Sequence, residues 1–336
     1  MYFLQYTISQ DDEDRRLDRV LRKFLKNDLS LSLIYKYLRN GEIKVNKKKS
    51  KPDYRTKKND IIFINEKLIS GENFSKSNES FSEKSQKQKE IEKISQEIQV
   101  LFENQYVKII NKPYNIPVQK AKKEEIALDE IIKFQHQPKE KSLSFLPGPL
   151  HRLDKKTTGV LVFSNNLVGA KVFSEIMQNQ HVTKTYIAIL EGKLSEKKRF
   201  KDSISKKENS KNNKFNTVSV NSKAENSKTA ITEVIPIKSG IYKNKEITLA
   251  KIKIFTGRTH QIRSQCAFHG FPLLGDTAYN KKTEKISKDV DFFLHAYSLT
   301  FPENNEIQLP TTITAALPKN FLKFLKNYLS LEDFVL

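Results

Sequence analysis

Residues 151–166, HRLDKKTTGVLVFSNN (His151 to Asn166), join a charged loop to an apolar strand. The run Gly159 to Phe163 is continuously apolar, which is typical of a strand buried on both faces. A rigid strand of this kind would hold the carboxylate of Asp154 in place, and functional groups are often found on loops that such a scaffold supports. We therefore take Asp154 as a candidate catalytic residue, with a turn-capping aspartate as the simpler alternative.

The charge balance points to a polyanionic partner. The 336 residues include 60 Lys and Arg against 39 Asp and Glu, a net charge of +21, and this excess favours nucleic acid. A membrane partner would require an apolar or amphipathic anchor, but the longest apolar runs are strand-sized. The acidic run Asp11 to Asp14 follows the amino terminus too soon for a secretory signal. We therefore expect RNA or DNA, not a membrane, as the partner.

Chain length and cysteine usage limit the organisation further. A length of 336 residues suggests two domains, since a domain usually has roughly 100–200 residues. The single cysteine, Cys266, cannot form an internal disulfide or a thiolate metal cluster, which favours a cytoplasmic protein. We also expect the protein to be a monomer.

The amino-terminal 65 residues are expected to form a small basic unit of two helices and a few strands. Apolar residues recur at helical spacing from Leu17 to Leu25, and again from Leu31 to Leu38 between Ser30 and Gly41. Alternation then predicts short strands around residues 42–46 and 60–64. Residues 30–65 contain ten Lys and Arg against three Asp and Glu, a net charge of +7, so an RNA contact is a natural expectation.

Two polar segments divide the rest of the chain. Residues Glu66 to Ile98 are dominated by Ser, Lys, Glu, Asn and Gln and are expected to be a flexible linker. Residues 99–336 would then form a larger domain, which Ser195 to Lys228 interrupts as a surface insertion or hairpin extension. Within it, residues 107–113 are predicted to form a strand that ends in a Lys-Pro turn, and further strands are predicted at residues 186–190 and 250–254. Helices are predicted at residues 167–179 and 261–269. This mixture predicts an α+β domain around a mixed, largely antiparallel central sheet with flanking helices.

Three ordered blocks carry a family resemblance. They are His151-Arg152-Leu153-Asp154 with the following Thr157-Thr158-Gly159, then Lys184-Thr185-Tyr186, then Gly257 to Arg263. This set resembles the RluA-type pseudouridine synthases, although Thr158 stands where Ser is commoner. The resemblance implies the pseudouridine synthase fold and the isomerisation of specific uridines to pseudouridine in RNA.

The same resemblance assigns roles to three residues. It makes Asp154 the catalytic carboxylate and Tyr186 the aromatic residue that stacks on the flipped base and assists proton removal from C5. It makes Arg263 the partner of the carboxylate, which helps to hold open the site left by the flipped nucleotide. Arg152 and Arg258 are expected to contact RNA, and His151 to support the loop.

The basic amino-terminal unit resembles the S4 RNA-binding domain. The resemblance is carried by Gly41, by Val45-Asn46 and by Asp60, and it departs from the family at Leu31, where Arg is usual, and at Lys47, where Gly is usual. It implies RNA contacts, for which the candidates are Lys36, Arg39 and Lys44. In this family an added S4 domain accompanies enzymes that act on large-subunit ribosomal RNA, which is the expected substrate.

The implied reaction explains which motifs the sequence lacks. Breaking a glycosidic bond, turning the base and rejoining it through C5 consumes no group, so we expect no cofactor and no metal. Accordingly, the sequence contains neither Gly-x-Gly-x-x-Gly nor His-Glu-x-x-His. An aspartate with an ordinary pKa near ~3.9 is ionised at neutral pH. The sequence leaves open whether Asp154 would attack C1′, add to C6 or remove the C2′ proton.

Other functions fit the sequence less well. A non-catalytic RNA-binding or ribosome-assembly protein with the same fold is the main alternative, and the joint presence of Asp154, Tyr186 and Arg263 argues against it. A protein kinase would require a Gly-rich loop and Asp-Phe-Gly, neither of which is present. A glycosidase would require a second carboxylate, and none accompanies Asp154 in its motif.

Overall fold

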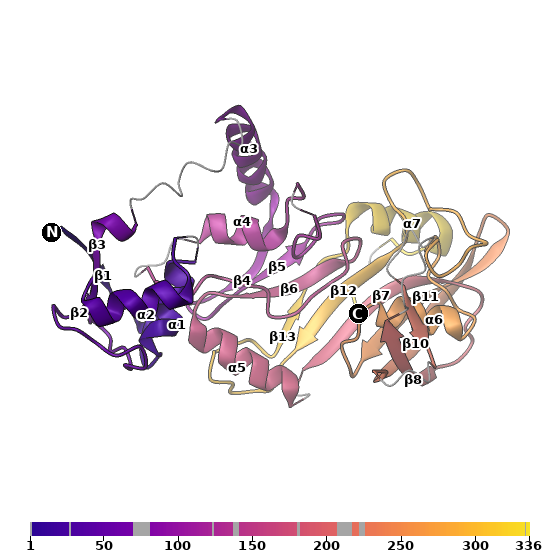
Figure 1. The fold of residues 1–336 in the computed structure, drawn as a ribbon. Helices are drawn as coiled ribbons and strands as arrows, with labels where there is room; N and C mark the ends of the chain where they lie inside the picture. The colour runs from indigo at the N-terminus through magenta and orange to yellow at the C-terminus, as the bar shows by residue number, and fades with distance from the viewer. Residues whose placement is uncertain are drawn as a thin grey trace.

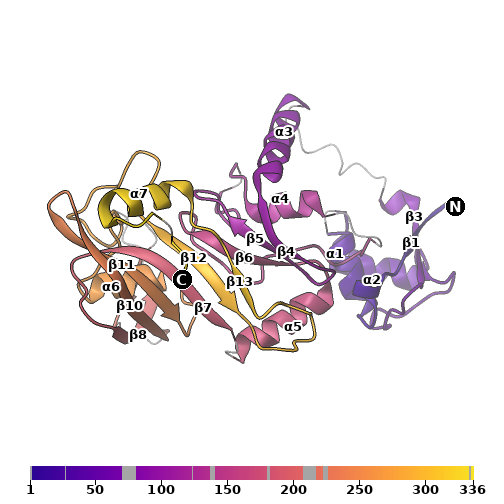
Figure 2. The ribbon, with the colours of Figure 1, turned by 180° about the vertical axis from the view of Figure 1, so that it is seen from behind.

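The computed structural model describes residues 2–26, 28–69, 81–122, 124–136, 141–179, 182–206, 217–221, 226–332 and 334–336. A small unit at the amino-terminal end of the chain lies beside helix α5(Leu167–Gln178), and a long twisted sheet extends away from it towards α6(Gln261–Phe268) and α7(Lys319–Leu329) (Figure 1, and from behind in Figure 2). Among the described residues, no helix is long and apolar enough to cross a membrane.

The amino-terminal unit consists of a three-stranded antiparallel sheet and a helical hairpin. Its strands are β1(Phe3–Thr7), β2(Ile43–Val45) and β3(Ile61–Asn65), in the order β1-β3-β2. The helices are α1(Leu17–Phe24) and α2(Leu31–Asn40), with short 3-10 helices at η1(Gln10–Asp12) and η2(Glu66–Leu68). The predicted ends of α2 are confirmed, since the Ser30 hydroxyl accepts a hydrogen bond from the Leu33 N–H and Gly41 is left-handed at φ 79°.

The two polar residues that suggested an S4 domain bind each other. The Asn46 side chain donates to the Asp60 carboxylate at 2.8 Å and accepts from the Ile61 N–H at 2.9 Å. Asn46 and Lys47 both have positive φ, 47° and 65°, and Val45 and Lys48 exchange two backbone hydrogen bonds around them. This is the geometry of a two-residue type I′ hairpin, so the turn forms although Lys replaces Gly.

The predicted flexible linker is wrong over its second half. Residues Phe81–Glu97 form helix α3, which packs against α4(Leu128–Gln135) and projects from the body of the protein (Figure 1). Ile91 and Ile98 are each only 8% exposed, and Ile94 packs beside them. The spacing of these three residues gives an otherwise polar segment one apolar stripe, which is enough to hold its carboxyl-terminal end. Residues 70–80 lie outside the described residues.

The larger unit is built on a mixed ten-stranded sheet. Its order is β4-β5-β6-β12-β7-β11-β10-β8-β9, with β13 beside β12. The pair β6–β12 is parallel and the other pairs are antiparallel, which confirms the predicted class. The strands are β4(Gln99–Glu103), β5(Val107–Lys112), β6(Thr158–Ser164), β7(Thr183–Glu191), β8(Lys198–Lys206), β9(Val218–Val220), β10(Lys228–Tyr242), β11(Lys245–Ile254), β12(Leu294–Thr300) and β13(Thr312–Thr314).

The predicted insertion contributes strands to this sheet. β8 pairs with β10 over seven residues, and β9 pairs with β8, so the segment is a hairpin extension of the sheet. Phe200 and Ile204 are buried there at 6% and 5% exposure. Residues 207–216 and 222–225 of the same segment lie outside the described residues.

Alternate residues of the central strands lie on opposite faces of the sheet and belong to separate hydrophobic cores. On one face, α4, α6 and Leu153 pack on residues such as Leu161, Tyr186 and Ile252. On the other face, the β6 residues Val160 and Val162 pack against α5, and the β7 residues Ile187 and Ile189 pack against α7. A Cβ atom on Gly159 would lie 2.2 Å from the backbone oxygen of Ala296, so only glycine lets β6 approach β12 this closely.

Candidate active site

The loop that precedes β6 is held rigidly on both sides of Asp154. Leu153 is buried in the core, and the Thr157 N–H donates to the Asp154 carbonyl at 3.0 Å to close a turn. The His151 ring accepts from the Val162 N–H at 3.2 Å and stacks on Phe173. Burial, with a contribution from the charge of Lys184, lowers the pKa of His151 to about 3, so its ring is neutral. The predicted supporting role of His151 agrees with these contacts.

A buried lysine fastens the same loop to the end of β5. The Lys112 side chain is 1% exposed, and its Nζ donates to the carbonyl oxygens of Pro113 and Lys155, each at 2.9 Å. Burial lowers the pKa of Lys112 to about 7, although the negative charge of Asp154 opposes the shift. Lys112 therefore ties the residue that follows Asp154 to the sheet.

Arg263 from α6 bridges two carboxylates. Its Nη1 donates to Oδ2 of Asp154 at 3.2 Å, while Nε and Nη2 donate to the two oxygens of Asp276 at 2.7 and 2.9 Å. The Asp276 and Arg263 side chains are 2% and 10% exposed, whereas that of Asp154 is 26% exposed. Burial alone would lower the pKa of Arg263, but the hydrogen bonds and charge of Asp276 and the charge of Asp154 raise it overall. The guanidinium is thus permanently charged, and Asp154 is the member of the trio that solvent and substrate can reach.

Two buried glutamines place α6 on the sheet. The Gln261 amide donates to the Ile231 carbonyl and to the Thr232 hydroxyl, and its oxygen accepts from the Arg258 N–H at 3.0 Å. One turn later, Gln265 donates to the Asp202 carboxylate at 2.7 Å and accepts from the Thr232 hydroxyl at 2.6 Å. Because Gln261 and Gln265 are only 3% and 0% exposed, these bonds fix the helix that carries Arg263.

His260 lies at the mouth of the site. Its Nε2 is 3.7 Å from Oδ2 of Asp154, and its Nδ1 is 2.9 Å from the Tyr279 hydroxyl. Burial lowers the pKa of His260, even though Asp154 favours its charged form. The Tyr279 hydroxyl accepts a hydrogen bond from the Val218 N–H, so its own proton can be donated to Nδ1, which places the ring proton on Nε2, facing Asp154.

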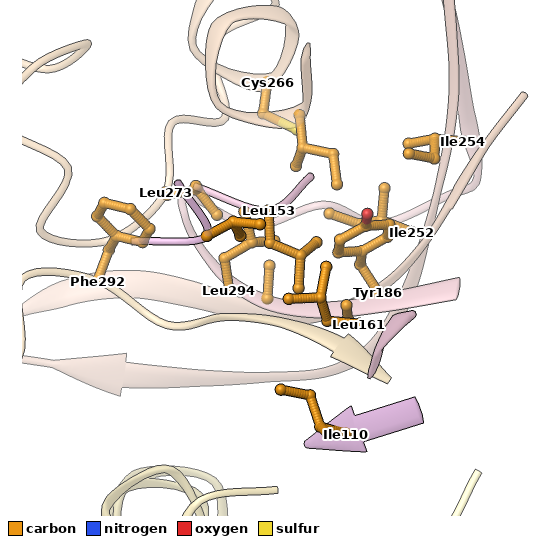
Figure 3. Packing of buried hydrophobic residues seen from close by; sticks show 14 of the residues in the cluster. Ile110, Leu153, Leu161, Tyr186, Ile252, Ile254, Cys266, Leu273, Phe292 and Leu294 are labelled. Atoms are coloured by element: carbon orange, nitrogen blue, oxygen red, sulfur yellow. The ribbon is translucent and has the colours of Figure 1, made fainter. Parts of the chain in front are cut away.

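Tyr186 from β7 completes this side of the sheet. It is 9% exposed and belongs to the core cluster that includes Leu153, and its ring projects towards the side where α6 and Cys266 lie (Figure 3). Burial, assisted by the charge of Asp154, raises the pKa of Tyr186, so the phenol is protonated at neutral pH. Such a group can stack on a base and donate a hydrogen bond.

The predicted RNA-binding residues fall on two surfaces. Arg152 and Arg258 are exposed on the active-site loops, and Arg258 also donates from Nε to the Thr229 carbonyl. Lys36 and Arg39 are exposed on α2, and Lys44 places its ammonium 4.7 Å from the centre of the Phe3 ring. The structure therefore brings Asp154 and Arg263 together, and it separates the amino-terminal candidates from them.

Comparison with known proteins gives this geometry a chemical meaning. The model of the family described as RNA pseudouridylate synthase matches residues 106–268, and that of the S4 domain matches residues 15–62. The Ribosomal large subunit pseudouridine synthase C of Pasteurella multocida is 31% identical over 300 residues, which cover 88% of this chain and 85% of that protein. The protein of the same name from Buchnera aphidicola (subsp. Baizongia pistaciae) is 31% identical over 95% of this chain and 96% of its own length.

The chain belongs to the RNA pseudouridylate synthase family. The predicted enzyme class, an isomerase of uridine in RNA with an S4 domain, is thereby confirmed, and the non-catalytic alternative is disfavoured. Solved structures of human pseudouridylate synthase proteins share the fold. RNA Pseudouridylate Synthase Domain Containing 4 aligns with a TM-score of 0.55 at 20% identity over 71% of this chain and 96% of its own. Domain Containing 1 aligns with a TM-score of 0.54 at 23% identity over 68% and 86%.

Sequence reasoning missed several residues of this pseudouridine synthase site. Asp276 was not predicted as a site residue, yet it holds Arg263 through two hydrogen bonds. The sequence predicts Lys112 only as part of a Lys-Pro turn, and no sequence pattern indicates Tyr279. The one local feature of the sequence near Asp276 is the glycine that precedes it. In the structure Gly275 has φ +85°, and a Cβ there would lie 2.0 Å from the Asp291 backbone oxygen, so the turn that places Asp276 requires glycine.

Proposed function

We propose that this pseudouridine synthase isomerises uridines of large-subunit ribosomal RNA and that Asp154 is the reacting group. The role of Asp154 rests on the different exposure of the Asp154, Arg263 and Asp276 side chains. Asp154 is open to substrate, while Arg263 and Asp276 are held behind it. The names of the bacterial relatives, which specify the ribosomal large subunit, support the first part.

The roles of the neighbouring residues follow from their contacts. Arg263 orients the Asp154 carboxylate and balances its charge without losing a proton. Tyr186, as a neutral phenol, provides a stacking surface for the extruded uracil, an interaction worth on the order of 1–3 kcal/mol. Arg152 and Arg258 contact the RNA backbone at the mouth of the site. The geometry is compatible with attack at C1′ or C6 and with removal of the C2′ proton.

The amino-terminal unit supplies a second RNA contact through Lys36, Arg39 and Lys44. In this proposal residues 1–65 and 99–336 are the two domains, and the matched family ranges fall within them. The proposal also takes the enzyme to be a cytoplasmic monomer that needs neither metal nor cofactor. Light scattering of the purified protein tests whether it is a monomer. Activity after dialysis against a chelator tests whether it needs a metal or a cofactor.

The decisive experiment is Asp154→Asn. The amide keeps the shape of the side chain but cannot act as a nucleophile or base, so tritium release from RNA labelled at C5 of uridine should fall to background. Thermal melting and RNA binding of the same preparation should be retained. Asp289→Asn, which neutralises an exposed carboxylate, is the matched control and should be fully active. Near wild-type turnover by Asp154→Asn would sink the assignment.

The substrate is tested separately by mapping pseudouridines in ribosomal RNA from cells that lack the gene. Loss of one or more large-subunit pseudouridines supports the proposal, and an unchanged large-subunit map overturns it. The amino-terminal contact is tested with Lys36→Gln/Arg39→Gln, which should weaken RNA binding and flatten its salt dependence because fewer counterions are released. Lys319→Gln/Lys323→Gln removes two exposed charges from α7, at the opposite end of the protein, and should leave the salt slope unchanged.

A further inference from the structure

A fully buried carboxylate joins the amino-terminal unit, called the S4-like unit below, to the larger unit that carries Asp154, called the catalytic unit. Asp12, in η1, is 0% exposed and accepts hydrogen bonds from three consecutive residues of the catalytic unit. Its Oδ1 accepts from the Ser142 hydroxyl at 2.7 Å, from the Ser144 N–H at 3.0 Å and from the Ser144 hydroxyl at 2.6 Å. Its Oδ2 accepts from the Leu143 N–H at 2.8 Å. Oδ2 also accepts from the Ser9 hydroxyl at 2.8 Å, so both oxygens of this carboxylate are occupied by hydrogen bonds within the protein.

Neighbouring contacts reinforce this junction. The Leu143 side chain packs against the hydrophobic core of the S4-like unit, so the catalytic unit completes that core. Arg15 donates to the Ser144 hydroxyl at 2.5 Å. Asp11 accepts from the Leu167 N–H at 2.7 Å, at the first turn of α5, where a carboxylate also meets the positive end of the helix dipole. The junction therefore combines apolar burial with directed hydrogen bonds.

The segment that Asp12 holds leads directly into the catalytic loop. Residues 142–144 are followed by Gly148 and Leu150, which are tied to β6 by the bonds from Ser164 N–H to the Gly148 carbonyl and from Leu150 N–H to the Val162 carbonyl. His151 and Asp154 come next. One short stretch of chain is thus fixed to the S4-like unit at its start and to the active site at its end.

The charge of Asp12 is suited to a permanent contact. Burial would raise the pKa of Asp12, but the hydrogen bonds from Ser144, Leu143, Ser142 and Ser9 outweigh it and lower the pKa overall. The carboxylate is therefore ionised at neutral pH, and the junction does not open by protonation under those conditions.

We propose that Asp12 is a positioning residue that holds the RNA-binding surface of the S4-like unit at a fixed separation from Asp154. The enzyme thereby selects structured RNAs in which the target uridine and a second stretch of backbone are held at the matching separation. This inference rests on the proposed function, because it assumes that both units bind the same RNA. A rigid link between two binding sites raises their joint affinity for such an RNA above that of a loose link.

The docking itself can be tested without RNA. Asp12→Asn places an amide N–H₂ against hydrogen-bond donors and should break the junction. Spin labels on Lys23→Cys and Glu175→Cys, exposed on α1 and α5, should give a narrow distance distribution in the otherwise wild-type chain and a broad one with Asp12→Asn. Cys266 is 0% exposed and burial raises its thiol pKa to about 12, so it should not take up the label. An unchanged narrow distribution would overturn the proposal, whatever the substrate is.

The consequence for catalysis is tested by measuring the kinetics of the enzyme on two RNA substrates. One is the full large-subunit ribosomal RNA transcript, and the other is a stem-loop confined to the nucleotides around a uridine mapped as described above. Asp12→Asn should lower kcat/KM for the transcript about tenfold through KM and leave the stem-loop rate unchanged. Asp14→Asn, which alters an 84%-exposed side chain in the same segment, is the control for both. Equal losses on the two RNAs would indicate a merely structural role and overturn the proposal.

A second variant guards against misfolding of the S4-like unit. Ser144→Ala removes the hydroxyl that donates to Asp12 and accepts from Arg15, and it leaves every residue of the S4-like unit unchanged. It should broaden the label distances and lower kcat/KM for the transcript in the same direction as Asp12→Asn, and combining both changes should add little. Fully additive losses in the double variant would contradict a shared junction. If ribosomal RNA were not the substrate, the wild-type enzyme would also fail on the transcript, while the label distances would still report the junction.

Discussion

Arg263 forms its two shortest hydrogen bonds with Asp276, at 2.7 and 2.9 Å, and not with the carboxylate that faces the substrate. The bidentate pair is buried, and the guanidinium also lies 4.8 Å from the ring centre of Phe292. Arg263 is thus anchored from behind, and only Nη1 is left to orient Asp154.

Asp276→Asn should therefore damage both stability and activity. Losing the bidentate carboxylate partner leaves the buried guanidinium with only its hydrogen bond to Asp154 as a charged contact, and costs about 1–3 kcal/mol. The freed guanidinium should also bind Asp154 more closely and withdraw it from the substrate, so kcat should fall with little change in RNA affinity. Urea unfolding and single-turnover kinetics measure the two effects, with Asp289→Asn as the exposed control. A stable, fully active variant would contradict the anchoring role.

Lys112→Met should separate stability from activity. The Lys112 pKa of about 7 lies below its usual value near ~10.5, so the folded state carries the full penalty of a buried charge below pH 7 and loses it as the pH rises towards 10.5. The variant should gain stability relative to the wild type most strongly below pH 7. Its kcat should nevertheless drop about tenfold, because the Lys155 carbonyl loses its donor and the catalytic loop loosens. Parallel loss or parallel retention of both properties would argue against this role for Lys112.

Lys47→Gly should stabilise the protein. Lys47 has φ 65° in the type I′ turn, a conformation that costs a residue with a side chain roughly 1–2 kcal/mol relative to glycine. The melting temperature in the absence of RNA should rise. Lys48→Gly removes the same charge from the next position, where φ is not positive, and should not stabilise. A rise with both variants would point to charge repulsion as the cause.

His295 should make the protein acid-sensitive before its carboxylates titrate. It is 0% exposed, receives a hydrogen bond from the Thr158 hydroxyl at 2.7 Å and lies 3.1 Å from the Ala315 carbonyl, and burial lowers its pKa to about 4. Between the unfolded value of ~6.5 and about 4, only the unfolded state binds the proton, so stability falls with pH by up to ~1.4 kcal/mol per unit. His295→Gln should show a shallower slope in urea unfolding across this range. An identical slope would exclude His295 as its source.

The sequence predicted those parts of the site that a local pattern encodes. The apolar run of β6 located the loop of Asp154, alternation located the strand of Tyr186, and the helix predicted at residues 261–269 is the one that carries Arg263. Their approach in space came from the family resemblance, because spacing along the chain does not determine how distant strands pair. Asp276 was missed for this reason, since its partner lies across a turn that has no periodicity.

In the amino-terminal half, too, local structure could be predicted from the sequence and contacts between distant segments could not. The helical hairpin and its caps were predictable, because Ser30 and Gly41 act within a few residues of themselves. Helix α3 was mistaken for a linker because its composition is polar, and only the stripe of Ile91, Ile94 and Ile98 indicated a packed face. The junction through Asp12 could not be predicted from the sequence. An acidic run is usually exposed to solvent, and the partners Ser142 and Ser144 are far away along the chain.

The place of β12 between β6 and β7 in the sheet determines when the enzyme becomes active during its own synthesis. β6 ends at Ser164 and β7 at Glu191, but the strand that joins them begins only at Leu294. The amino-terminal unit closes its own sheet within residues 3–65 and is able to fold early on the translating ribosome. The Asp154 loop and Tyr186 cannot take their final places until β12 has left the exit tunnel, so we expect a nascent chain that already presents its amino-terminal unit to be inactive until residues 294–300 have emerged.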